Sequence, residues 1–145
     1  MLIHLACEMS TLDESAAVGA RIRFYRSKRR MTSYTLAGLC GISRHAVMDY
    51  ENGVTEPTLE DLRNIASTLG VDADKLYDDY YRFLAYPYSE LVKKIRLENH
   101  LLQRELGEML GVTRRAVERW EHGRNRVTRE VWERFRKLGL WGNFR

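Results

Sequence analysis

The sequence predicts an all-α protein built from two similar helical modules in tandem. Apolar residues recur at three- and four-residue spacing, and no useful stretch alternates with period two. The segment from Leu36 to Gly53 returns seventy residues later as Leu106 to Gly123, with seven of its eighteen positions identical. A chain of 145 residues has room for two such modules, each near the smallest size that buries its own core.

The first copy is predicted to contain four helices. They are an opening helix with Val18 and Ile22 on its inner face, short helices over 33–40 and 44–51, and a longer helix over 59–69. Serine or threonine precedes each of the last three, and glycine follows both short ones, which is the usual punctuation of helices. The second copy repeats this order, with helices over 103–110 and 114–121 after an opening helix through Ile95.

Two short helices joined by a glycine turn, with a small residue on the first helix, form a helix-turn-helix. The small residues are Ala37 and Gly107, and the turns run through Gly41 and Gly111. Both copies resemble the Cro/C1-type (XRE-like) helix-turn-helix family over about residues 16–85 and 89–138, including a closing aromatic-Glu-x-Gly. The resemblance implies two lambda-repressor-like bundles in tandem that bind double-stranded DNA.

We expect four segments along the chain: a poorly ordered tail over 1–15, a first domain over 16–70, a linker helix over 71–88 and a second domain over 89–145. The linker is rich in tyrosine, with an apolar stripe at helical spacing formed by Leu76, Tyr77, Tyr80, Tyr81 and Leu84. This stripe is expected to pack into the core or between the domains. The alternative is a homodimer interface.

Net positive charge is concentrated in the two copies. Residues 21–70 carry a net charge of +3 and residues 91–145 carry +7, whereas residues 1–20 and 71–90 carry −3 each. Basic modules on either side of an acidic hinge fit a polyanionic partner such as DNA. We expect the second copy to bind more strongly than the first.

The resemblance implies that the second short helix of each copy enters the major groove. Three positions of this helix are then expected to read bases: the first two, and the one before the inward aromatic residue. A glutamine that begins the preceding helix is expected to do the same. These residues are Arg44, His45, Asp49, Gln103, Arg114, Arg115 and Arg119. Arginine suits this role because its guanidinium pairs with O6 and N7 of guanine. Caps and the following loop are expected to contact phosphates: Ser33, Ser43, Asn52, Thr113, His122, Arg124, Asn125, Arg126, Thr128 and Arg129.

A matching arginine and glutamate flank each helix-turn-helix. The resemblance implies that Arg26 pairs with Glu51, and Arg96 with Glu121, as ion pairs inside the fold. An unpaired acid at the end of a DNA-facing helix would repel phosphate, so its neutralisation by arginine makes physical sense.

The sequence therefore predicts a DNA-binding transcriptional regulator, expected to be a repressor, whose two unequal helices act as an intrachain pseudo-dimer on an asymmetric site. The alternative is an antitoxin, or an accessory protein of a mobile-element or conjugation complex that acts mainly through protein contacts. We expect no catalytic residue, cofactor or metal, because the four histidines are scattered and no glycine-rich phosphate loop is present. No membrane segment is expected, and the predicted location is the cytoplasm, on the nucleoid.

Overall fold

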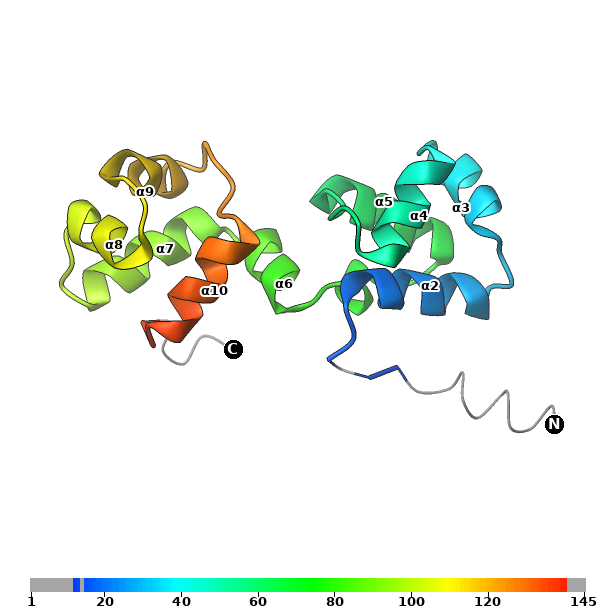
Figure 1. Cartoon of the computed structure of the whole chain (residues 1–145), viewed down its shortest axis with the longest axis horizontal. Coiled ribbons are helices and arrows are strands. Elements are labelled where there is room, and N and C mark those ends of the chain that lie inside the picture. Colours follow the sequence, from blue (N-terminus) through cyan, green and yellow to red (C-terminus); the bar gives the residue numbers. More distant parts are fainter. Residues whose placement is uncertain (1–11, 14, 141–145) are drawn as a thin grey trace. The chain divides into compact units, whose positions relative to one another are not determined.

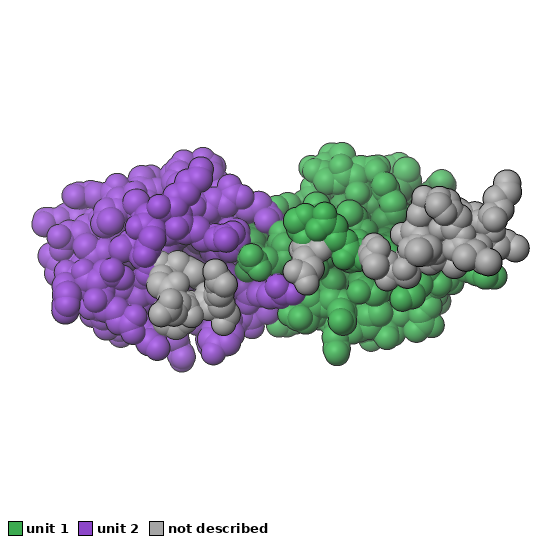
Figure 2. Space-filling view, turned by 90° about the horizontal axis from the view of Figure 1, so that it is seen from below, with its two compact units in different colours: residues 1–81 green, residues 82–145 purple. Residues whose placement is uncertain are grey.

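The computed structural model describes residues 12–13 and 15–140, and within them every regular element is a helix (Figure 1). The chain divides into two compact units, residues 1–81 and 82–145 (Figure 2). The predicted all-α class and tandem arrangement are therefore confirmed. The tail expected over residues 1–15 falls almost entirely outside the described residues.

The first unit is built around a helix that packs against two others. Its elements are α2 (Val18–Lys28), α3 (Ser33–Cys40), α4 (Arg44–Asn52), α5 (Leu59–Leu69), a 3-10 turn (Ala73–Lys75) and the start of α6 (Asp79–Ala85). Helix α4 packs on α2 and α3, and α3 also packs on α5. The hydroxyls of Thr32, Ser43 and Thr58 cap α3, α4 and α5, each accepting from a backbone N–H at 3.0–3.1 Å.

The second unit repeats this packing. Its main helices are α7 (Tyr88–Glu98), α8 (Gln103–Leu110), α9 (Arg114–Glu121) and α10 (Arg129–Lys137). Helix α9 packs on α7 and α8, and α10 packs on α8. Leu102 stands where a hydroxyl would cap α8, and the Glu105 carboxylate instead accepts from the backbone N–H of Leu102 at 2.9 Å.

Residues seventy positions apart have the same structural role. Fully buried aliphatic residues form three such pairs: Ile22 with Val92, Leu36 with Leu106, and Val47 with Val117. A side chain of α5 or α10 also caps the helix before the turn in each unit: Asn64 Nδ2 donates to the Cys40 carbonyl at 2.7 Å, and Arg134 Nη1 donates to that of Leu110 at 3.0 Å. The duplication therefore extends to the polar contacts that end individual helices.

The tyrosine-rich segment over 71–88 differs from the single linker helix that its spacing predicts. It contains the 3-10 turn and then α6, while Tyr88 already begins α7. The Asp78 carboxylate accepts from the Tyr81 N–H at 3.0 Å, so a new helix starts after Asp78 instead of continuing from the 3-10 turn.

The apolar stripe of this segment is buried, although Tyr86 beyond it is exposed. Tyr80 and Tyr81 are fully buried, and Tyr77, Phe83 and Leu84 are nearly so. The Tyr81 hydroxyl donates to the Pro57 carbonyl at 2.6 Å, and its ring stacks on Tyr77 with centroids 6.3 Å apart. The burial of these rings fits the packing role expected for the stripe, and the homodimer interface stays a prediction.

Two glycines offer a direct test of the helix packing in the first unit. A Cβ added at Gly19 would lie 2.2 Å from the backbone oxygen of Tyr50, whereas one at Gly38 would meet nothing within 4 Å. We expect Gly19→Ala to destabilise the chain by about 1–3 kcal/mol. Gly38→Ala should stabilise it by about 0.5–1 kcal/mol, because alanine is the better helix former. Urea unfolding followed by circular dichroism measures both, and equal effects would contradict the close approach of α2 to α4.

Candidate nucleic-acid interface

Helices α4 and α9 each present one face to the core and one to solvent. Their inward sides are anchored by Val47 and Val117, which are fully buried, and by the aromatic residues Tyr50 and Trp120. The Tyr50 hydroxyl donates to Asp61 at 2.6 Å. Burial, with that hydrogen bond to an acid, raises the pKa of Tyr50 to about 12, so the phenol is neutral at physiological pH.

The outward face of α4 begins with two exposed basic residues. Arg44 is the first residue of α4 and His45 the second, and both are exposed. The guanidinium carbon of Arg44 lies 6.0 Å from the ring centroid of Tyr34 on α3. Asp49 lies one turn further along and is half-buried. The first two base-reading positions expected on α4 are therefore exposed at the N-terminus of this helix.

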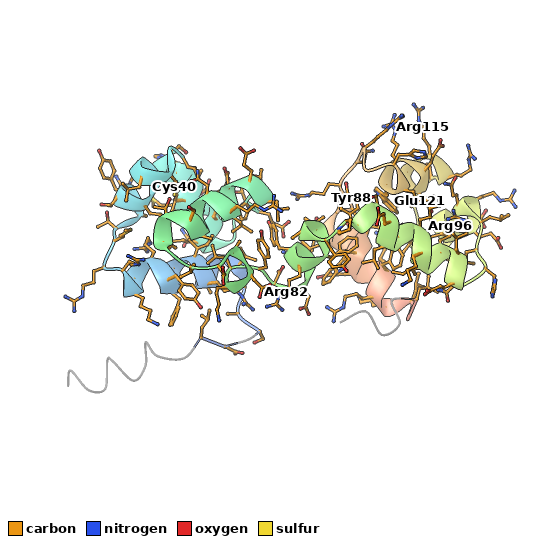
Figure 3. The ribbon with its side chains drawn as sticks, turned by 180° about the vertical axis from the view of Figure 1, so that it is seen from behind. Cys40, Arg82, Tyr88, Arg96, Arg115 and Glu121 are labelled. Carbon is orange, nitrogen blue, oxygen red and sulfur yellow. The ribbon has the colours of Figure 1, made fainter. Side chains whose placement is uncertain are left out.

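The outward face of α9 carries three arginines. Arg114 and Arg115 are exposed and Arg119 is half-buried. Figure 3 shows Arg115 at the outer edge of the second unit, pointing away from its body. Arg114 Nη2 lies 3.6 Å from a carboxylate oxygen of Glu118 one turn later. This face therefore offers a denser cluster of arginine donors than the matching face of α4.

Both expected ion pairs between an arginine and the closing glutamate are present. Arg26 Nε and Nη2 donate to the two carboxylate oxygens of Glu51 at 2.5 and 3.0 Å, and Arg96 Nε donates to Glu121 at 2.6 Å. Both glutamate side chains are only 4% exposed. The hydrogen bond to Glu51 raises the pKa of Arg26 above its ordinary value and outweighs the opposing effect of burial. These buried pairs neutralise the acid at the end of α4 and of α9.

Each arginine also holds the turn that leads into the next helix. Arg26 Nη1 donates to the Met31 carbonyl at 2.7 Å, and Arg96 Nη1 donates to that of Leu101 at 2.9 Å. The residue before each of these carbonyls, Arg30 or His100, has a φ of 55° or 56° in the left-handed region. This tight turn sets where the following helix begins.

Gln103 has a structural contact that sequence reasoning did not anticipate. Its Nε2 donates to the second carboxylate oxygen of Glu121 at 2.5 Å, and the side chain is half-buried. One N–H of this amide is therefore used within the fold, and the base contact predicted for Gln103 stays a prediction for its second N–H and its carbonyl oxygen.

Arg23 is a second residue that sequence reasoning missed. It lies on α2, yet its Nη2 donates to Asn52 Oδ1 at 2.6 Å and its Nε lies 3.5 Å from Glu51. It is about half exposed, so it places a cation at the end of α4, where the following loop (54–56) has none. Its sequence position, far from the helix-turn-helix, gave no signal of this.

Several predicted phosphate contacts act first as helix caps. Thr113 and Thr128 cap α9 and α10, accepting from backbone N–H groups at 3.1 and 3.3 Å, as Ser43 does for α4. A capping hydroxyl uses an oxygen lone pair, so its O–H can still donate to phosphate. Ser33 begins α3 and is half-buried. Asn52 accepts from Arg23 through its oxygen and keeps its NH₂ group for the same purpose.

The loop after α9 carries the remaining predicted phosphate contacts. Arg124, Asn125 and Arg126 are exposed, and Arg129 at the start of α10 is half-buried. The Asn125 carbonyl accepts from the Tyr88 hydroxyl at 2.9 Å, which ties this loop to α7. His122 Nδ1 lies 2.8 Å from the Glu118 carbonyl and must donate there, so its other nitrogen can donate to phosphate only in the protonated ring.

Two negative findings apply to the described part of the chain. No group of three or more His, Cys, Asp or Glu side chains is placed there to hold a metal ion. None of the helices described has the length and apolar character needed to cross a membrane.

Comparison with known families agrees with this arrangement. Residues 19–82 match the family described as "Helix-turn-helix domain", and residues 92–137 match the one described as "Helix-turn-helix". Each match contains one of the two helices α4 and α9. No curated protein and no solved structure matches the chain. The two consecutive matches confirm the tandem helix-turn-helix organisation inferred from the repeat.

The buried pair in the second unit is open to a controlled test. Glu121→Gln leaves Arg96 without its carboxylate, and we expect a loss of about 3 kcal/mol in the free energy of unfolding. Glu98→Gln is the control, because the Lys94–Glu98 pair is exposed at 4.0 Å and should contribute less than about 0.5 kcal/mol. All three tryptophans lie in residues 82–145, so their fluorescence follows this unit alone. Equal losses in both variants would show that the pair does not stabilise the fold.

Proposed function

We propose that the chain, which belongs to the Cro/C1-type helix-turn-helix family and holds two such domains in tandem, is a transcriptional regulator that binds double-stranded DNA sequence-specifically. The observation that carries this proposal is the pair of outward faces on α4 and α9. In each unit a buried ion pair fixes the end of the helix while exposed basic side chains stand at its beginning. This is the arrangement that base readout in the major groove requires.

The finer proposal is that one chain reads two half-sites as a pseudo-dimer. Linking two binding modules makes the second contact intramolecular and raises the overall affinity without a second chain. Because Arg44, His45 and Asp49 differ from Arg114, Arg115 and Arg119, the two half-sites should differ in sequence. We propose that regulation is repression, in which the bound chain blocks access to its operator.

The two units are proposed to contribute unequally. The second unit has three arginines on its reading face and further cations in the loop over 124–126, whereas the loop over 54–56 contains no cation and one glutamate. Counterion release from phosphate supplies much of the affinity for DNA, so the unit with more cations should anchor the complex. The first unit then refines the choice of site.

Selection from a randomised duplex pool tests the sequence preference. We expect an asymmetric consensus with guanine in both halves, since arginine stands at the leading position of each helix. Recovery of perfectly palindromic sites would contradict the unequal pseudo-dimer. A pool without enrichment would contradict sequence-specific binding altogether.

Two arginine variants separate base reading from phosphate contact. Arg115→Ala should reduce discrimination at one position by about 1–3 kcal/mol. Arg124→Gln should instead weaken binding to every sequence alike and reduce the dependence of log K on log salt concentration by about one unit. Fluorescence anisotropy titrations at several salt concentrations measure both quantities. The assignment fails if the two variants show the same pattern.

A further inference from the structure

Tyr34 is a large aromatic side chain that the core does not use. It is the second residue of α3 and is 70% exposed, although its unit buries Tyr77, Tyr80 and Tyr81 almost completely. A ring left in solvent gains little from burial, so its contribution to folding is small. The guanidinium of Arg44, at the start of α4, lies over its ring.

The contact between Tyr34 and Arg44 crosses the turn of the helix-turn-helix. The guanidinium carbon of Arg44 lies 6.0 Å from the ring centroid of Tyr34, which is within the range of a cation–π interaction. Ser43 caps α4 immediately before Arg44, so the backbone that carries this arginine is also fixed. The backbone of Arg44 is therefore fixed, and its exposed side chain has the ring of Tyr34 within reach of a cation–π contact.

We propose that Tyr34 is a positioning residue that holds Arg44 in place to read guanine in the first unit, an inference that rests on the proposed function. All five N–H donors of a guanidinium lie in its plane. A cation–π contact draws on the positive charge of the group and does not require its N–H donors. The two donors that pair with O6 and N7 of guanine therefore remain available in the positioned side chain.

The second unit positions its leading arginine differently. The residue seventy positions after Tyr34 is Arg104, which lies 4.0 Å from Glu108. Arg114 instead lies 3.6 Å from Glu118 on its own helix. This separation is that of an exposed ion pair, whose attraction is weakened by salt. The guanidinium of Arg114 is thus held near an acid on its own helix, whereas that of Arg44 faces an aromatic ring on the preceding helix.

A double-mutant cycle on the complete chain tests this role. The dissociation constant is measured for wild type, Tyr34→Ala, Arg44→Ala and the double variant, on the selected duplex and on one with 7-deazaguanine at the guanine assigned to Arg44. We expect Tyr34→Ala to weaken binding to the selected duplex by about 2–5-fold. It should have no effect in the Arg44→Ala background and a smaller effect on the 7-deazaguanine duplex, which keeps O6 but lacks N7. Tyr34→Phe should bind like wild type, because the ring is retained.

Two controls test whether the loss of affinity is specific to Tyr34 and Arg44, or follows from removing any exposed aromatic ring or any arginine. Tyr86→Ala removes a ring that is 65% exposed and should leave affinity unchanged. Tyr34→Ala combined with Arg114→Ala should be additive, because Arg114 belongs to the other unit. Thermal unfolding of each variant verifies that the fold is retained.

The inference is overturned if Tyr34→Ala and Arg44→Ala are additive, or if Tyr34→Phe loses as much affinity as Tyr34→Ala. The second result would assign the tyrosine hydroxyl to a phosphate contact. If the wild-type chain shows no preference among duplexes, the proposed function itself fails. That result comes from the wild-type measurement alone, whereas the variants test only the role of Tyr34.

Discussion

The buried arginine–glutamate pair is the interaction on which the arrangement of each unit depends. One guanidinium joins three parts of the chain: it starts from the opening helix, bonds to the glutamate that ends α4 or α9, and bonds to the carbonyl of the turn before the next helix. The carboxylate of each pair is only 4% exposed, and removing the partner of a buried charge strongly destabilises a fold. The pair therefore sets how α4 lies across α2 and how α9 lies across α7, and with that, which side chains face outward.

The helices and their order could be predicted because the chain marks them locally. Ser43 and Thr113 cap the helices they were expected to cap, and Gly41 and Gly111 end the preceding helices with φ values of 68° and 71°. Such signals act over three or four residues, so a single sequence contains them. The partners of each ion pair lie 25 positions apart, beyond the reach of such local signals. Family resemblance is what predicted these pairs.

The contacts that were missed depend on how helices meet in space. Nothing local indicates that Arg23 reaches Asn52, or that Gln103 donates to Glu121, because each contact joins two helices. The left-handed conformations of Arg30 and His100 are not favoured by their residue types, and are held by the turn that Arg26 or Arg96 closes. The 71–88 segment divides because Asp78 caps a new helix, although the apolar spacing around it continues.

The duplicated scaffold separates what is shared from what has diverged. Core residues, turns and ion pairs match at a separation of seventy residues, whereas the outward side chains differ in charge and in the way they are held. Net charge alone does not describe this difference, because Arg26, Arg96 and Arg134 are used for contacts within the fold. The outward side chains of α4 and α9 are the basis for proposing that one unit anchors the complex and the other refines the choice of site.

We propose that a single chain reads DNA with two unequal helices. Hydroxyl-radical footprinting on a selected duplex, combined with native mass spectrometry of the same complex, tests it directly. We expect one chain per duplex and two protected patches, with the stronger protection lost when Arg114 and Arg115 are both replaced by alanine. Two chains per duplex with a symmetric footprint would contradict it.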